Sequence, residues 1–257
     1  MTRAVASDTL RATPHYRAEV FRAGLARLGY EVGQVPKASP APQDVLLVWN
    51  RHGLNQNYAE RYERAGARVI VVENGFIGTD GSGNQLYAIA LNHHLGAGEW
   101  RIGAENRWAR LKIRLKPWRC SGREIIVLPQ RGIGPPGVAM PTGWTDDVVR
   151  RLKAVTDRPI RVRLHPGKSR TDPWDDLQDA WAAVTWASGA GIKAIVHGVP
   201  VFHELPQWIG SPSAKFGISQ IEEPFLGDRL PMLERLAFAQ WTLAEIASGE
   251  AFRSVLG

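Results

Sequence analysis

A turn built from serine and glycines is the first place in this sequence where residue types and spacing indicate binding chemistry. The segment WASGAGIK, residues 186–193, has the pattern of the end of a buried strand, a Ser-Gly turn and the start of a helix. Unpaired N–H groups at the start of a helix attract anions, and glycines let a ligand approach the backbone closely. We expect Gly189 and Gly191 to serve that purpose, with Ser188 adding a hydroxyl group and Lys193 a cation. The alternative is an ordinary strand-to-helix turn that needs small residues for packing.

Two further loops indicate the same kind of ligand. His165 and Pro166 follow one predicted strand, and Arg131 follows another. Because ligands of open α/β sheets bind at the carboxyl ends of the strands, these residues and the turn at Ser188 would line one pocket. Together they predict a site for a phosphate-bearing ligand, with a hydrogen-bonded structural histidine as the alternative role of His165.

Two glycine patterns that resemble nucleotide-binding motifs fail on their neighbouring residues. The sequence GKS at 167–169 ends like a P-loop, but Val162 stands where that motif requires its first glycine, which argues against a kinase or ATPase. The sequence GIGPPG at 132–137 has the spacing of a dinucleotide fingerprint, but Pro135 and Pro136 prevent a helix from starting inside it.

These loops need a scaffold of alternating strands and helices, and the first half of the chain predicts one. Continuous apolar runs at 44–49 and 67–73 are typical of strands buried on both faces, and the second run is expected to stop at Asn74 and Gly75. Shorter strands are expected at 3–7 and 30–35, and helices at 14–28 and 57–65.

The second half repeats this pattern. Strands are expected at 124–129, 159–164, 183–186 and 198–202, and helices at 145–155 (capped by Thr142 or Thr145), 174–180 and 191–197. Strands separated by helices indicate parallel sheets, so we predict an α/β fold of two Rossmann-like lobes. The N-terminal lobe would comprise residues 1–117 and the C-terminal lobe residues 118–230. The helix of the last segment, 231–257, would pack across the lobes with no strand after it.

Composition places this scaffold among globular proteins of a reducing compartment. Of the 257 residues, 44% are hydrophobic and 22% are charged. No apolar run approaches the roughly 18–20 residues of a membrane span, and residues 1–17 lack the apolar core of a signal peptide. The single Cys120 excludes an intramolecular disulfide and a multi-cysteine zinc site. We therefore expect a cytoplasmic protein.

With these motifs in place, the sequence resembles glycosyltransferases of the two-lobed GT-B type. Residues 183–202, AVTWASGAGIKAIVHGVPVF, resemble their donor-binding segment. His165-Pro166 followed by Ser188 is similar to the HP and Ser motifs of bacterial sialyl- and Kdo-type transferases, where these motifs contact the nucleotide phosphate. Residues 71–78 (VVENGFIG) and 240–252 (QWTLAEIASGEAF) resemble phage-encoded glycosyltransferase-type proteins.

The resemblance implies a nucleotide-sugar donor, which we expect to be UDP-linked, and no further cofactor. The donor-binding residues would be Arg131, His165, Pro166, Ser188, Gly189, Gly191 and Lys193. Many hexose-transferring members have a ribose-binding glutamate where this chain has Lys193, so the nucleotide stays open.

The resemblance also implies that the charge of the leaving group is met by these residues rather than by a metal ion. The chain contains no DxD motif, in keeping with a metal-independent site. An inverting reaction would need a general base on the N-terminal lobe. We favour Glu73, at the end of a predicted buried strand, where a turn-capping carboxylate is the alternative role. His52 and Asp8 are the other candidates.

The formal charge of +7 is concentrated in one segment. Residues 101–123 contain eight basic residues and one acidic residue, Glu105, so the rest of the chain is neutral. Basic and apolar residues alternate over 110–116, so a strand there would present four cations on one face. Trp100, Trp108 and Trp118 lie among the arginines and offer surfaces for stacking on bases.

This pattern predicts DNA as the acceptor, with the sugar added to a hydroxymethylated pyrimidine such as hydroxymethylcytosine of bacteriophage DNA, in the host cytoplasm. The residues expected to contact DNA are Arg107, Trp108, Arg110, Lys112, Arg114, Lys116, Trp118 and Arg119. A solvated strand with buried tryptophans is the alternative for the segment. The alternatives for the function are a transferase for cell-surface polysaccharide or a lipid-linked acceptor, whose basic face meets an anionic membrane, and a non-catalytic nucleotide- or DNA-binding protein.

Overall fold

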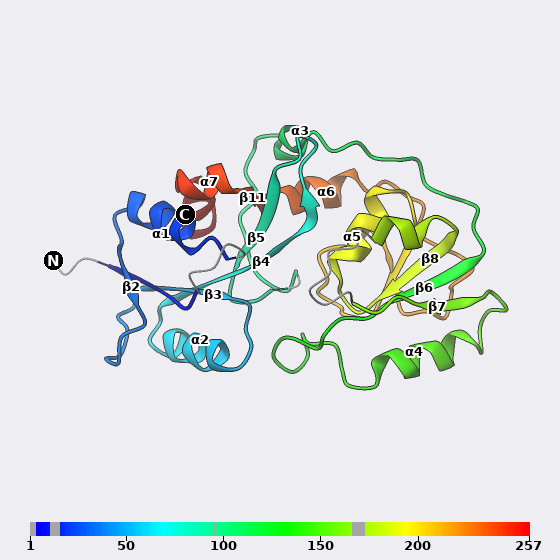
Figure 1. The fold of residues 1–257 in the computed structure, drawn as a ribbon, viewed down its shortest axis with the longest axis horizontal. Helices are drawn as coiled ribbons and strands as arrows, with labels where there is room; N and C mark the ends of the chain where they lie inside the picture. The colour runs from blue at the N-terminus through cyan, green and yellow to red at the C-terminus, as the bar shows by residue number, and fades with distance from the viewer. Residues whose placement is uncertain (1–3, 11–15, 95, 166–172) are drawn as a thin grey trace. The chain divides into compact units, whose positions relative to one another are not determined.

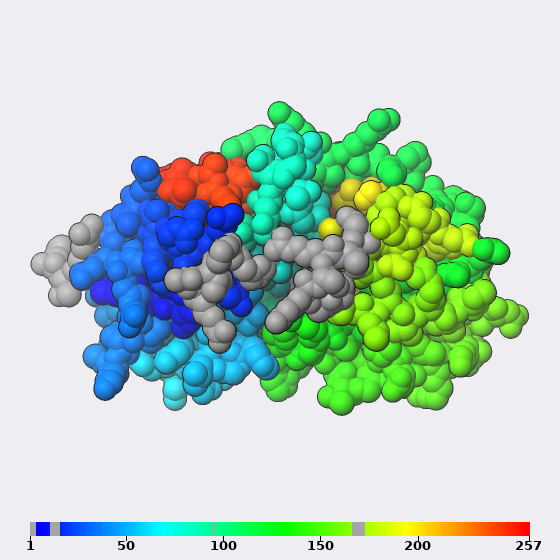
Figure 2. All heavy atoms as spheres, viewed as in Figure 1, coloured from blue at the N-terminus to red at the C-terminus, as the bar shows by residue number. Residues whose placement is uncertain are grey.

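The chain divides into two compact units. The computed structural model describes residues 4–10, 16–94, 96–165 and 173–257, and Figure 1 and Figure 2 draw the others in grey. Unit 1 contains Met1–His94, Gly98–Leu111 and Arg235–Gly257, and unit 2 contains Leu95–Ala97 and Lys112–Glu234. The boundary therefore lies before the predicted one at 117–118, and most of the segment 231–257 belongs to unit 1.

Unit 1 is built on a six-stranded sheet with the order β11-β5-β4-β3-β1-β2. Strands β1 (Val5–Asp8), β2 (Glu31–Gln34), β3 (Val45–Trp49) and β4 (Arg68–Thr79) are parallel, and β5 (Gln85–Leu91) and β11 (Gln240–Thr242) continue the sheet in antiparallel pairing. Its helices are α1 (Ala18–Arg27), α2 (Leu54–Arg64), α3 (Arg107–Leu111), α7 (Leu243–Ala247) and α8 (Glu250–Leu256).

Both faces of this sheet are buried, which explains the continuous apolar runs in the sequence. In β3, Val45 and Leu47 pack in a core that includes side chains of α1 and α8, whereas Leu46 and Val48 pack against α2. Figure 1 shows α2 on one side of the sheet and α1 and α7 on the other. Since successive side chains of a strand point to opposite faces, one apolar run fills two cores.

Unit 1 departs from the predicted elements at two places. Strand β4 continues past Asn74 to Thr79 because it pairs with β5, a strand that we did not expect from the sequence. Gly75 is required there, since a Cβ atom would lie 2.6 Å from the carbonyl oxygen of Leu86. The predicted terminal helix is also interrupted: α6 (Leu230–Ala237) is followed by β11, so the expectation of no further strand is wrong.

Unit 2 is built on a five-stranded parallel sheet with the order β10-β9-β8-β6-β7. The strands are β6 (Glu124–Leu128), β7 (Ile160–Val162), β8 (Ala180–Thr185), β9 (Val201–His203) and β10 (Lys215–Phe216). The helical elements are α4 (Trp144–Leu152), α5 (Gly189–Val196) and the 3₁₀ turns η1 (Pro173–Leu177) and η2 (Ser211–Ser213). The predicted α-helix at 174–180 is therefore a short 3₁₀ turn, and α4 follows Gly143 without a side-chain cap from Thr142 or Thr145.

The core of unit 2 confirms the predicted layering. Trp144, Val148 and Leu152 of α4 pack with Ile125 and Val127 of β6 on one face of the sheet. Figure 1 shows α5 on the opposite face. Both units are thus α/β layers with mostly parallel sheets, as predicted. Among the helices in the described ranges, none combines the length and the apolar character that a membrane crossing requires.

Candidate functional site

The carboxyl edge of the unit 2 sheet brings together three of the predicted phosphate-binding loops. β6 leads to Arg131, β7 leads to His165, and β8 leads to Ser188. These strands are parallel neighbours in the order β8-β6-β7, so their loops leave the same edge of the sheet. Pro166, also predicted for these loops, lies outside the described residues.

Ser188 is the N-cap of α5, and hydrogen bonds fix its position from both sides. Its Oγ accepts the N–H of Ala190 at 3.1 Å, and its own N–H donates to Oγ1 of Thr185 at 3.0 Å. The buried Thr185 hydroxyl in turn donates to the carbonyl oxygen of Leu128 in β6 at 3.1 Å. The turn is thus attached to the neighbouring strand. A hydroxyl group accepts and donates at once, so Ser188 can cap the helix and still offer its proton to a ligand.

The two glycines of the turn have different surroundings. A Cβ atom on Gly191 would lie 3.0 Å from the indole of Trp208 and 3.1 Å from Cγ2 of Thr185, and Trp208 is 2% exposed. The buried core thus leaves no room for a larger side chain at Gly191, which supports the alternative that this glycine is needed for packing. Gly189 is the first residue of α5, where N–H groups have no partner inside the helix. The predicted contact with an anion thus depends on Gly189 more than on Gly191.

Lys193 lies one helical turn further on. It belongs to the last turn of α5 and is half-buried, so its backbone is not part of the N-terminal turn. The cation that we expected at the start of the helix is better supplied by the loops after β6 and β7.

Burial and two arginines lower the pKa of His165. Burial lowers the pKa of His165 below its usual value of 6.5, and the positive charges of Arg131 and Arg163 lower it further. Because β6 and β7 are adjacent parallel strands, the loops that carry Arg131 and His165 leave the same edge of the sheet side by side. Arg131 and His165 therefore contribute a cation and an imidazole to the same edge of the sheet.

Arg163 and Gln130 belong to this edge, although we did not predict them. Nε of Arg163 lies 2.5 Å from Asp176, whose carboxylate also binds Arg161 at 2.8 Å. The sequence does contain the signal for this pair, because residues two apart in a strand share a face. Gln130 accepts the N–H of Ala187 at 2.9 Å and so supports the turn before Ser188, and nothing in its local sequence indicates that contact.

The three candidate bases belong to unit 1, where the carboxyl ends of β1, β3 and β4 share an edge. Asp8 ends β1, but its carboxylate already accepts hydrogen bonds from Arg22 at 2.8 and 3.0 Å. His52 follows β3 and is exposed. Glu73 is half-buried inside β4, so the prediction that it ends a strand is wrong, because pairing with β5 extends the strand. The catalytic roles of these residues stay predictions.

The strand predicted over 110–116 is not formed. Helix α3 ends at Leu111, Lys112 lies in a turn with a φ of 52°, and the residues from 113 to 120 belong to no helix or strand. The alternation of exposure nevertheless persists. Lys112, Arg114 and Lys116 are exposed, and Ile113 and Leu115 between them are half-buried.

Arg107 and Trp108 do not have the surface positions that contact with DNA requires, so these two predictions are wrong. Arg107 is 1% exposed and Trp108 7%. The guanidinium of Arg107 lies 3.7 Å from the ring centroid of Trp241 and donates to Glu245 at 2.9 Å. Burial alone would raise the pKa of Glu245, but hydrogen bonds from Arg107 and Thr242 outweigh it and hold that pKa below its usual value. The pair belongs to the interior of unit 1.

Other members of the basic segment are also engaged within their own unit. Arg110 forms ion pairs with Glu105, Glu245 and Glu250 at 2.9–3.2 Å. Arg119 donates to the carbonyl oxygen of Leu177 at 2.8 Å.

The tryptophans near this segment offer less stacking surface than the sequence suggested. The guanidinium of Arg229 lies 4.3 Å from the ring centroid of Trp118, and that of Arg235 lies 5.2 Å from the ring of Trp100. One face of each indole is therefore already covered, which weakens the expectation that they stack on bases.

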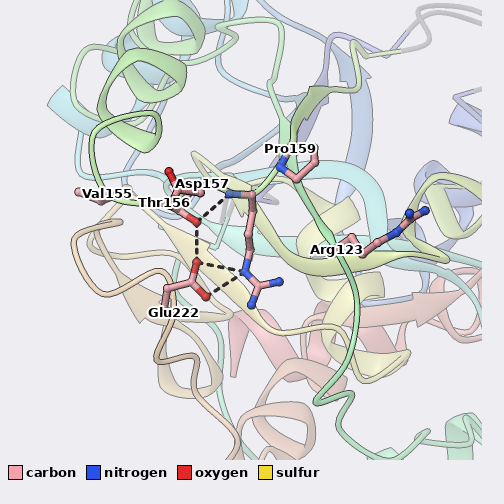
Figure 3. Close-up of a pocket in the computed structure, with 7 residues that line it drawn as sticks. Arg123, Val155, Thr156, Asp157, Pro159 and Glu222 are labelled. Atoms are coloured by element: carbon pink, nitrogen blue, oxygen red, sulfur yellow. Dashed lines mark hydrogen bonds and ion pairs between the residues drawn. The ribbon is translucent and has the colours of Figure 1, made fainter.

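An open depression of about 560 Å³ lies at the opposite, amino edge of the unit 2 sheet. Figure 3 shows Glu222 hydrogen-bonded to Thr156, with Arg123 pointing away from them. Glu222 also forms an ion pair with Arg158 at 2.9 Å, and Arg123 pairs with Asp179 at 2.7 Å. Its charged groups thus neutralise one another, which makes it a weaker candidate than the carboxyl edge. Within the described ranges, no group of three or more His, Cys, Asp or Glu side chains is arranged to hold a metal ion.

Comparison with solved structures identifies the architecture. The chain is similar to the beta Kdo 2,7 transferase of Thermosulfurimonas dismutans KpsC, with a TM-score of 0.56 and 13% identity over 97% of this chain and 99% of that chain. It is similar to the beta Kdo 2,4 transferase of the same protein, with a TM-score of 0.55 and 14% identity over 93% of this chain and 90% of that one. No protein-family model and no curated protein sequence matches. These likenesses agree with the two mostly parallel sheets and show that the chain has the same overall fold as these two structures.

Proposed function

We propose that this protein is a glycosyltransferase that moves a sugar from a nucleotide-sugar donor to a hydroxyl group of an acceptor. The observation that carries the proposal is the convergence of the Ser188 turn with the loops of Arg131 and His165 at one edge of the unit 2 sheet. The names of the two similar structures, both Kdo transferases, support the same class of reaction. A non-catalytic nucleotide-binding protein on this fold would use the same edge without turnover.

The proposed role of this edge is to bind the donor phosphate and stabilise the charge of the leaving nucleotide. The N–H of Gly189 and the hydroxyl of Ser188 would donate to phosphate oxygens, and Arg131 would supply positive charge. Fixed donors and cations aimed at a developing negative charge do the work that a metal ion does in other transferases. We therefore propose a metal-independent site, with UDP-linked sugars as the first donors to test.

The acceptor that we propose is a polysaccharide or lipid-linked glycan. Hydroxymethylated DNA is the second candidate, favoured by the exposed cations Lys112, Arg114 and Lys116. It has weaker support than the sequence suggested, because Arg107 and Trp108 are buried. For removal of the acceptor proton, Glu73 and His52 stay the candidate bases on unit 1.

Mass spectrometry of acceptors incubated with a panel of nucleotide sugars tests this function. Glycans, lipid-linked glycans and hydroxymethylated DNA should be offered side by side, with release of free nucleotide followed in the same samples. We expect Arg131→Gln to lower kcat/KM by roughly 100-fold, the usual effect of removing one charge-stabilising group, while Lys153→Gln, on an exposed residue elsewhere in unit 2, leaves it unchanged.

The outcomes of this experiment separate the alternatives. Full activity of the Arg131→Gln variant would contradict the proposal that the carboxyl edge of unit 2 takes part in the reaction. Nucleotide binding without release or transfer, across the panel, would favour the non-catalytic protein. Turnover by Glu73→Gln at a near-normal rate would exclude Glu73 as the base.

A further inference from the structure

Three exposed cations occupy alternate positions in the segment at the start of unit 2. We name Lys112, Arg114 and Lys116 the basic strip. Among the described residues, no carboxylate forms an ion pair with any of the three, in contrast to Arg110 just before them. Ile113 and Leu115 between them are half-buried, whereas the three cations are exposed on the surface of this segment. This arrangement leaves their charge available to a partner.

Exposed apolar side chains lie beside this strip. The guanidinium of Arg229 donates to the carbonyl oxygen of Lys116, and the indole N–H of Trp118 donates to the carbonyl oxygen of Gly227 at 2.8 Å. These bonds hold the chain around 227–229 against the strip. Leu226 and Leu230, on either side of that contact, are 43% and 38% exposed.

The one acidic residue between the two leucines does not cancel the charge of the strip. Asp228 is exposed, and its Oδ1 accepts the N–H of Leu230 at 2.9 Å at the start of α6. Its carboxylate therefore has a local capping function. The surface as a whole combines cations with leucines.

We propose that the basic strip, with Leu226 and Leu230, binds the surface of a membrane that contains anionic phospholipids. Lys and Arg side chains near such a surface are attracted by the negative headgroups, and neighbouring leucines can enter the boundary between headgroups and acyl chains. The cations and the leucines would then both contribute to membrane binding. This inference goes beyond the proposed function, because it concerns where the protein binds rather than what it transfers.

The same residues fit a nucleic acid less well. Proteins that bind single strands present free aromatic faces to the bases. Here Arg229 covers Trp118, and the ring of Trp174 contacts Nζ of Lys116 at 4.2 Å and stacks on His197 at 4.2 Å. Phosphates of a duplex would use the cations but would gain nothing from exposed leucines.

Co-sedimentation with vesicles tests the proposal without any donor or turnover, so its failure is distinct from a failure of the proposed function. The full chain is mixed with vesicles of equal parts phosphatidylglycerol and phosphatidylcholine, and with vesicles of phosphatidylcholine alone. We expect binding to the first only, decreasing as salt is added, since screening weakens attraction between exposed charges.

Two matched variants identify the surface. Lys112→Gln with Arg114→Gln should weaken binding roughly 25-fold, at about fivefold for each cation removed. Lys37→Gln with Lys153→Gln removes the same charge from exposed positions elsewhere and should bind like the natural chain. Leu226→Ser should weaken binding at unchanged charge. Circular dichroism verifies that each variant is folded.

Several results would overturn the proposal. One is equal binding to neutral vesicles; another is equal weakening by the two charge-matched variants. In a parallel arm with single-stranded and duplex oligonucleotides, tight binding that depends on Lys112 and Arg114, with no binding to anionic vesicles, would assign the strip to nucleic acid instead.

Discussion

Thr185 is the residue whose replacement tests most directly how the candidate donor site is held together. Its hydroxyl donates to the carbonyl oxygen of Leu128 at 3.1 Å and accepts the N–H of Ser188 at 3.0 Å, and the side chain is fully buried. Valine has the same shape but no hydroxyl group. Thr185→Val would therefore keep the packing against α5 and delete the bridge between β6 and the Ser188 turn.

The expected cost follows from the two groups that lose a partner. A buried polar group left without a hydrogen bond costs about 1–3 kcal/mol, and the Leu128 carbonyl lies in an interior strand where this applies in full. The N–H of Ser188 is only part-buried, so water can replace some of its bond. We expect unit 2 to lose about 1–3 kcal/mol in its free energy of unfolding. Thr185→Ser keeps both bonds and loses one buried methyl group, at about 0.8 kcal/mol.

Amide hydrogen exchange at Ser188, combined with urea unfolding, measures both effects. In Thr185→Val the N–H of Ser188 should exchange faster, and nucleotide-sugar affinity should fall because the turn is less ordered. In Thr185→Ser the exchange rate should stay close to that of the natural chain. If the exchange rate of Ser188 and the stability were both unchanged in Thr185→Val, the hydroxyl bridge would not be what positions this turn.

Four further predictions concern Arg131, His165, Arg107 and Gly191. Arg131→Gln should raise the pKa of His165, followed by NMR, because a neighbouring positive charge is lost; an unchanged pKa would mean that the two residues are not close. Because the pKa of His165 in the native state lies below its ordinary value of 6.5, the native state binds fewer protons than the unfolded state. The contribution of His165 therefore lowers the free energy of unfolding as the pH falls below 6.5. His165→Gln should flatten that pH dependence in urea titrations. Arg107→Ala should destabilise unit 1 by about 3–5 kcal/mol, because it leaves buried carbonyl groups and Glu245 without their partner, whereas Arg114→Ala should stay within about 0.5 kcal/mol. Gly191→Ala should cost about 1–3 kcal/mol through its approach to Trp208, while Gly33→Ala, where no atom lies within 4 Å of the added Cβ, should be neutral in thermal unfolding.

The parts of the fold that could be predicted from the sequence are those in which local pattern and burial agree. The apolar run at 44–49 predicts a strand buried on both faces, and β3 is one. The turn at Ser188 combines a capping residue, small residues and an apolar helix, and all three indicate the same boundary. Parallel topology then places the loops after β6, β7 and β8 at one edge without knowledge of any side-chain contact.

The parts that could not be predicted depend on contacts between distant residues. Strand β5 forms because β4 and β11 pair with it on either side, a fact that the local sequence does not contain. The alternation over 110–116 is typical of a strand, yet a strand needs a neighbour to hydrogen-bond with, and the residues after Leu111 have none in the described structure. Their alternation instead leaves the three cations exposed and the two apolar side chains half-buried.

The basic segment shows why formal charge is an incomplete guide to a binding surface. Over residues 101–123 nearly all charges are positive, but the carboxylates that pair with them come from far along the chain. Glu245 and Glu250 neutralise Arg107 and Arg110, and Asp179 pairs with Arg123. Outside residues 101–123 the acidic and basic residues are equal in number. The carboxylates that pair with this segment are therefore matched by the same number of basic residues in the rest of the chain. A candidate partner surface is therefore found by setting aside each cation that has a carboxylate partner. Within the described part of the chain, the three cations of the basic strip have no such ion pair.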